Sequence, residues 1–357
     1  MHRLYFIGEV QKVTFGNRRA ACLTLTESAL TASFLPPIAQ ALIAIVAGIA
    51  LLVWSADRFV AGAAALAKNL GMSPMLIGLT IVSLGTSAPE VLVSVQAALM
   101  GTGSIAMGNA IGSNIANIGL VLGCTALIAA IPVQRHLLTV EIPVLLAVTA
   151  LAGFFLADAT ISRLEGWILL LVLPPVLWFL ARSKRRENTE DESPKLPEIS
   201  TAASAFWFAI GLGLLIVAAK ILVWGAVFTA QYFSVSPLII GLTVLAVGTS
   251  LPELAASVVS ACKGHHDIAL GNVIGSNIFN LLAVMSLPAV LAPLHAESAV
   301  FSRDFAAMAI LTLALSLAIA LPLLVKKAGK TATIGRLTGA GLLLLYAAYI
   351  GLLFFNP

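Results

Sequence analysis

One stretch of 49 residues occurs twice in this chain. Ser73–Val121 and Ser236–Val284 lie 163 residues apart and are identical at 26 of their 49 positions when aligned without a gap. Each copy has a lone glutamate, Glu90 or Glu253, in an otherwise apolar run, four residues after a threonine. A repeat of this size indicates a fold built from two similar halves, with the paired glutamates at corresponding places in them.

The composition indicates that both halves lie in a membrane. The chain is 60% hydrophobic and only 10% charged, whereas soluble domains are about 25% charged. Its charge-free runs include Val91–Gln134, Ile221–Pro252 and Phe305–Val325. About 20 apolar residues suffice for a transmembrane helix, and the alternation typical of a β-barrel is missing from the sequence. The sequence therefore predicts an all-α integral membrane protein, and the net charge of +4 does not indicate nucleic-acid binding.

The apolar runs predict ten transmembrane helices, five in each half. We expect them at about residues 37–70, 75–100, 105–131, 137–156, 164–180, 203–232, 237–261, 268–291, 305–325 and 334–355. The predicted organisation is an N-terminal tail (1–36), a first half (37–181) with repeat 73–121, a hydrophilic linker (182–200) and a second half (201–357) with repeat 236–284. Because five is odd, the second half enters the membrane upside down, which makes the two halves inverted repeats.

The basic residues predict the orientation of the chain. One set of loops contains Lys68, Arg135, the Arg182–Lys195 linker, Lys263 and the Lys326–Arg336 loop. Apart from the basic N-terminal tail, the opposite loops contain only Arg163 and Arg303. The positive-inside rule places the first set in the cytoplasm and both termini outside it. The expected location is the inner or plasma membrane of a bacterium or archaeon.

A proline follows a glycine in each repeat and predicts a broken helix. The first repeat reads Gly85-Thr86-Ser87-Ala88-Pro89-Glu90 and the second reads Gly248-Thr249-Ser250-Leu251-Pro252-Glu253. Proline lacks a backbone donor, so it loosens the helix and frees carbonyls, which persist in a membrane only where they line a cavity. Spacings of three and four residues place the threonine, serine and glutamate on one helical face.

A second motif supplies more polar side chains. Gly112-Ser113-Asn114-Ile115-Ala116-Asn117 has its counterpart in Gly275-Ser276-Asn277-Ile278-Phe279-Asn280. We expect one site built from the following ten residues: Glu90, Glu253, Thr86, Thr249, Ser87, Ser250, Ser113, Ser276, Asn117 and Asn280. Their oxygen atoms suit hard cations such as Ca²⁺ and Na⁺. Two buried carboxylates need one divalent ion, two monovalent ions or two protons, and this requirement is the physical basis for exchange.

These motifs resemble the two α-repeats of the Ca²⁺/cation antiporter superfamily, in its sodium/calcium exchanger branch, and most closely its bacterial and archaeal members. The motif match covers both repeats, and the five-plus-five plan extends it over nearly the whole chain. The resemblance implies that Glu90 and Glu253 are the central ion-binding carboxylates. It also implies that the ten residues above line the site, together with a backbone carbonyl near Ala246. In that family the first and sixth helices slide past the remaining bundle.

One residue departs from the family pattern and leaves alternatives open. Several exchangers have aspartate where this chain has Asn280. The first hypothesis is Na⁺/Ca²⁺ exchange, and the second is a Ca²⁺/H⁺ or other cation/proton antiporter that uses the same glutamates. A channel or an intramembrane hydrolase fits less well. We expect no enzymatic activity, no cofactor beyond the transported Ca²⁺, Na⁺ or H⁺, and no partner beyond membrane lipid and small cations.

Two further polar groups receive structural interpretations. Asp57 and Arg58 are adjacent in the first helix and are expected to neutralise each other near its end. His265 and His266 are expected in a solvated loop.

Overall fold

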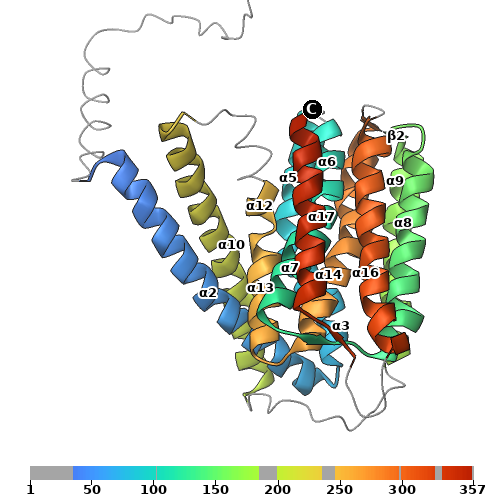
Figure 1. The fold of residues 1–357 in the computed structure, drawn as a ribbon, viewed down its shortest axis with the longest axis horizontal. Coiled ribbons are helices and arrows are strands. Elements are labelled where there is room, and N and C mark those ends of the chain that lie inside the picture. Colours follow the sequence, from blue (N-terminus) through green and yellow to red (C-terminus); the bar gives the residue numbers. More distant parts are fainter. Residues whose placement is uncertain are drawn as a thin grey trace, which may run out of the picture.

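The computed structural model describes residues 35–101, 103–184, 199–234, 246–296, 299–325 and 332–355. Within these ranges the protein is a helical bundle with four strands of two residues each (Figure 1). Eight of the described helices are long and apolar enough to cross a membrane. A pair bent by 44° forms a ninth candidate if it is counted as one span. The predicted tail lies almost wholly outside the described residues, as does most of the predicted linker.

The first half begins with a long helix and continues through segments interrupted by π-helical turns. Its elements are α2 (Pro37–Leu70), α3 (Pro74–Ile77), η1 (Gly78–Val82), α4 (Ser83–Thr86), α5 (Ala88–Leu99), α6 (Gly103–Ala116), η2 (Asn117–Leu122), α7 (Gly123–Ile128), β1 (Ile131–Pro132), η3 (Leu137–Glu141), α8 (Ile142–Leu156), β2 (Thr160–Ile161) and α9 (Arg163–Lys184). The predicted helices fall on these segments, and the ninth candidate span is the pair Pro74–Thr86 and Ala88–Leu99.

The second half repeats this order. Its elements are α10 (Thr201–Tyr232), α12 (Ala246–Thr249), α13 (Leu251–Cys262), α14 (His266–Phe279), η5 (Asn280–Val284), α15 (Ser286–Leu291), β3 (Leu294–His295), η6 (Val300–Phe305), α16 (Ala306–Val325), β4 (Thr333–Ile334) and α17 (Arg336–Phe355). Residues 235–245, where the predicted seventh helix begins, lie outside the described residues. The count of ten therefore stays a prediction.

Local sequence explains where α2 begins and ends. Pro37 occupies the first turn, where its missing N–H costs nothing, and the helix stops at Gly71, which adopts φ 63°. The N–H groups of Gly71 and Met72 donate to the carbonyls of Lys68 and Ala67, as in a common C-terminal cap. Ser73 then caps the next helix through its hydroxyl, which accepts from the N–H of Leu76 at 3.2 Å.

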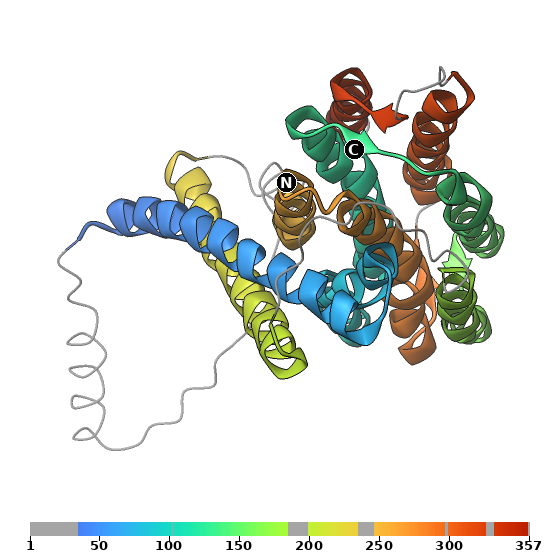
Figure 2. The same ribbon diagram turned by 90° about the horizontal axis from the view of Figure 1, so that it is seen from below.

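Helices α2 and α10 cross each other beside the rest of the bundle (Figures 1 and 2). Glycines allow their backbones to approach closely. A Cβ added to Gly62 would lie 2.5 Å from the backbone nitrogen of Phe208, and one added to Gly211 would lie 2.6 Å from that of Phe59. Phe59 and Phe208 also pack ring against ring at 5.0 Å. These two helices share a smaller hydrophobic core with Ile77 and neighbouring residues.

Two antiparallel strand pairs join the halves. β1 pairs with β4 through Ile131 and Ile334, and β2 pairs with β3 through Thr160 and His295. The two pairs lie at opposite ends of the bundle (Figure 1). The 163-residue offset of the repeats also relates Ile131 of β1 to Leu294 of β3.

The adjacent charges of α2 do not neutralise each other as expected. They lie well inside the helix, and Asp57 instead forms an ion pair of 2.6 Å with Lys263, in the turn between α13 and α14. The Arg58 guanidinium lies over the rings of Trp54 and Trp207, at 5.7 and 5.2 Å. A long-range ion pair and cation–π contacts thus replace the expected local pair.

The same turn overturns the expectation for the histidines. His265 is only 9% exposed, and His266 is the first residue of α14. Burial, together with the neighbouring charge of Lys263, holds the pKa of His265 below its usual value.

Candidate cation-binding site

Each glutamate lies in the first turn of a helix that begins just after a break. α4 ends at Thr86 and α5 begins at Ala88, so Glu90 lies in the first turn of α5. In the second half, Glu253 lies in the first turn of α13, after α12 ends at Thr249. The first turn of a helix favours negative charge because its N–H groups lack intrahelical partners. The prolines of the motif, Pro89 and Pro252, sit there without loss of a helical hydrogen bond.

Both carboxylates are buried in the interior. Glu90 is 1% exposed and Glu253 is 0% exposed. The Ser87 hydroxyl donates to Oε1 of Glu253 at 3.1 Å, which joins the two halves. The other oxygen of each carboxylate, Oε2, is buried without a hydrogen-bond partner among the described residues.

Polar atoms without partners recur in the other predicted residues. Both side-chain amide atoms of Asn117 and of Asn280 are buried and unpartnered within the described part of the chain, as are the hydroxyls of Ser250 and Ser276. Ser113, which lies four residues before Asn117, is also buried, with 4% of its surface exposed. Native proteins leave few buried polar atoms unpaired, so such a concentration calls for a ligand, an ion or water.

The two threonines end the short helices α4 and α12, and Ala246 begins α12. The Thr86 hydroxyl lies 3.2 Å from Oδ1 of Asn272 and 3.4 Å from the carbonyl of Ser83. Thr249 is the last residue of α12, and Ala246 is the first. The structure therefore places a helical backbone at Ala246 but describes neither its side chain nor residues 235–245, which precede it.

Two asparagines outside the predicted set support the glutamates. Asn109 donates to the Glu90 carbonyl at 3.1 Å and to the Ser94 hydroxyl at 2.8 Å. Asn272, at the matching position, donates to the Glu253 carbonyl at 3.4 Å and to the Ser257 hydroxyl at 3.0 Å. Asn109 and Asn272 lie three residues before the second motif of each repeat. They are therefore positioning residues, a role that their occurrence in both repeats could have suggested.

The backbone at Asn117 and Asn280 is also unusual. Each asparagine is the first residue of a π-helical segment, η2 or η5. Such segments are rare and frequently occur at functional sites. The sequence predicted continuous helices here, because hydropathy follows apolar content and carries no signal for hydrogen-bond register.

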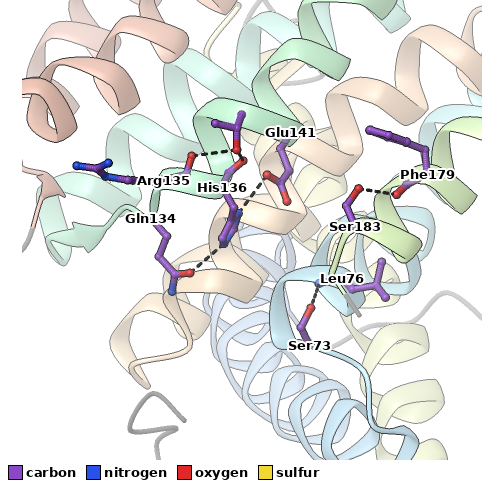
Figure 3. Close-up of polar contacts among 9 residues, drawn as sticks. Ser73, Leu76, Gln134, Arg135, His136, Glu141, Phe179 and Ser183 are labelled. Carbon is purple, nitrogen blue, oxygen red and sulfur yellow. Dashed lines mark hydrogen bonds and ion pairs between the residues drawn. The ribbon is translucent and has the colours of Figure 1, made fainter. Parts of the chain in front are cut away.

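A buried acid outside the site also escaped sequence reasoning. Glu141 is fully buried at the end of η3, and its Oε2 lies 3.2 Å from Nδ1 of His136 (Figure 3). Nε2 of His136 lies 2.9 Å from Oε1 of Gln134. At the matching position in the second half, Asp304 is paired with Arg303 at 2.9 Å and accepts from the Tyr349 hydroxyl at 3.1 Å. Each of these acids is paired with another side chain of the protein.

The geometry thus offers a buried, oxygen-rich site with two carboxylates and no soft ligand. Within the described ranges, no group of three or more His, Cys, Asp or Glu residues could hold a metal ion. The donors are hydroxyls, amide oxygens and carboxylates, which suit hard cations rather than transition metals.

Comparison with known proteins identifies the family. A family model described as "Sodium/calcium exchanger protein" matches residues 40–181 and 203–355. This chain belongs to the sodium/calcium exchanger protein family. The predicted membership of the Ca²⁺/cation antiporter superfamily is confirmed.

Two relatives and one solved structure match this exchanger along nearly their whole length. The putative antiporter CaxA of Alkalimonas amylolytica is 45% identical over 88% of this chain and 98% of its own. The sodium/calcium exchanger MaX1 of Methanosarcina acetivorans is 30% identical over 86% of this chain and 97% of its own. A solved structure of the sodium-calcium exchanger NCX_Mj, soaked with 10 mM Na⁺ and zero Ca²⁺, is 32% identical, with a TM-score of 0.75 over 88% of this chain and 99% of that one. This exchanger is therefore a multi-pass membrane protein of a transporter family.

Proposed function

We propose that this exchanger is a secondary active antiporter that moves Ca²⁺ against Na⁺ at the site between Glu90 and Glu253. The observation that supports the proposal is that both carboxylates, together with Asn117, Asn280 and Ser276, have buried polar atoms without a partner among the described residues. An ionised carboxylate buried without a partner costs several kcal/mol. A bound cation removes that cost and takes up the free oxygens.

The charge of the site couples the two ions. Two carboxylates are neutralised by one Ca²⁺ or by two Na⁺, and each ion that leaves must be replaced before the site is again electrically balanced. The remaining ligands would be Thr86, Ser87, Ser113, Thr249 and Ser250, with the Ala246 carbonyl. Because the two halves contribute corresponding groups, the ion would sit between the halves, near the middle of the membrane.

We further propose that the fold is ten helices in two inverted repeats of five. The strand pairs support this arrangement, because β1 and β3 occupy matching positions and each pairs with a strand of the other half. The matching contacts of Asn109 and Asn272 support it as well. Helices α2 and α10 would be the elements that move, since they form a crossed pair beside the rest of the bundle.

The proposed membrane is the inner or plasma membrane of a bacterium or archaeon, with both termini outside the cytoplasm. The β1–β4 pair supports this orientation. It places Arg135 and Arg336, which follow β1 and β4, at one end of the bundle. We propose no cofactor and no partner beyond lipid and the transported cations.

The second candidate is a cation/proton antiporter. Asn280 favours it, since an amide cannot supply the third negative charge that a more highly charged site would use to hold extra Na⁺. In that case, protons would neutralise Glu90 and Glu253 when Ca²⁺ leaves. The same residues would form the site.

One experiment separates the two candidates. Purified protein in liposomes loaded with Na⁺ would be given external radioactive Ca²⁺, with choline-loaded liposomes at the same pH as controls. Uptake that requires internal Na⁺ supports Na⁺/Ca²⁺ exchange. Uptake that follows an imposed pH gradient and ignores Na⁺ would refute it in favour of the second candidate.

A further inference from the structure

A groove runs along the outer face of the bundle, between α16 and α17. Its volume is about 650 Å³, and it is lined by Ala314, Leu317, Ala318, Leu321, Pro322, Thr338, Gly341, Leu342 and Leu345. Small residues leave the space open, and leucines line its sides. A Cβ added to Gly341 would meet no atom within 4 Å. All but one of the lining side chains are apolar, the exception being the Thr338 hydroxyl.

The groove lies in one half of the membrane. It uses the C-terminal half of α16 and the N-terminal half of α17, the two parts nearest β4. In a bilayer, lipid tails are as apolar as leucine, so no hydrophobic force drives the two helices together. An open groove in lipid instead gains dispersion contacts when an acyl chain fills it.

The end of the groove is positively charged. Arg336 begins α17 next to β4 and is exposed, as is Arg135, two residues beyond Val133, whose N–H donates to the Ala332 carbonyl at 2.9 Å. The sequence between α16 and β4 adds Lys326, Lys327 and Lys330, and residues 322–340 include no acidic residue. Basic pockets between transmembrane helices favour anionic lipid headgroups.

We propose that the groove binds one anionic phospholipid, with an acyl chain against Gly341 and Ala318 and its phosphate facing Arg336 and Arg135. The lipid fills the groove and neutralises two arginines that have no acidic partner among the described residues. This site is separate from the cation site and does not depend on which ions are exchanged.

Gly341 and Gly351 give a matched pair for the test. Both lie in α17 and have open space around an added Cβ, but only Gly341 lines the groove. The wild type, Gly341→Phe and Gly351→Phe would be reconstituted in nanodiscs of equal dioleoylphosphatidylglycerol and dioleoylphosphatidylcholine, released, and examined by native mass spectrometry for retained lipid. We expect the wild type and Gly351→Phe to retain phosphatidylglycerol, and Gly341→Phe to retain at least threefold less.

The headgroup is tested by Arg336→Gln. This exposed substitution leaves the groove intact, so we expect lipid to be retained with the preference for phosphatidylglycerol reduced at least threefold. It also decides the proposal if Gly341→Phe does not fold. Equal retention by Gly341→Phe and Gly351→Phe, no headgroup preference in the wild type, or a dimer without lipid that only Gly341→Phe dissociates would each overturn the proposal.

Discussion

Single side chains decide whether the buried site can hold a charge. Glu90 and Glu253 each have an oxygen without a protein partner within the described residues, and Ser87 from one half donates to Glu253 in the other. A buried carboxylate without a partner is stabilised when a cation or a proton neutralises its charge. The residue scale is therefore where ion binding is tested most directly.

We expect Glu90→Gln and Glu253→Gln each to abolish Ca²⁺ transport while the protein still folds. Glutamine has nearly the same shape but no charge, so the attraction for the cation is lost and the cost of an unpaired buried charge disappears. Ca²⁺ should raise the melting temperature of the wild type by mass action and leave that of each variant unchanged. Transport at wild-type rates by either variant would remove that glutamate from the site.

Asn280→Asp should alter the choice of ions. A third carboxylate would make the site more negative, so we expect transport to depend more strongly on Na⁺ or on pH. Asn117→Asp is the control in the first half, at the matching position. The measurement is Ca²⁺ uptake as a function of internal Na⁺ and of pH, and an unchanged profile would show that Asn280 is not a ligand.

At the scale of elements, the sequence was most informative where strong local rules apply. The ends of α2 coincide with the predicted residues 37 and 70 because Pro36 and Pro37 mark its start and Gly71 follows its end. The helix break before each glutamate was predicted because proline and glycine interrupt an apolar run in both repeats. The π-helical segments, the Asp57–Lys263 ion pair and the buried Glu141 were missed, because each depends on register or on a partner distant in the sequence.

The close packing of α2 against α10 can be tested with two glycines of α10, Gly211 and Gly213, which lie two residues apart. A Cβ added to Gly211 would clash with the Phe59 backbone, whereas one added to Gly213 would meet nothing within 4 Å. We expect Gly211→Ala to destabilise the protein by about 1–3 kcal/mol through overpacking. Gly213→Ala should be neutral, or stabilising by about 0.5–1 kcal/mol as a better helix former. Thermal unfolding in detergent measures both, and equal effects would contradict the close packing.

At the scale of the whole molecule, the orientation proposed from the basic residues predicts which cysteines a membrane-impermeant reagent can reach from each side of the membrane. Cys262 is exposed at the end of α13, beside Lys263 in a turn assigned to the cytoplasm. With Cys22 and Cys124 replaced by serine, a membrane-impermeant thiol reagent should label Cys262 in inside-out vesicles and spare it in right-side-out vesicles.

A cysteine introduced at the other end of the bundle provides the control. Ala157 is exposed after α8, three residues before β2. Ala157→Cys, in the chain without Cys262, should show the opposite pattern of labelling. The reverse labelling pattern for both cysteines would show that the protein has the opposite orientation in the membrane.

The two short strand pairs impose an order on biogenesis. Ile131 lies at the end of the third predicted span, whereas its partner Ile334 lies just before the last helix, α17. That partner leaves the ribosome only when synthesis is almost complete. The early helices are therefore inserted in the bilayer while β1 still lacks its partner β4, next to the insertion machinery. A nascent chain that stalls before β4 would expose this edge and give quality-control proteases a recognisable, unfinished product.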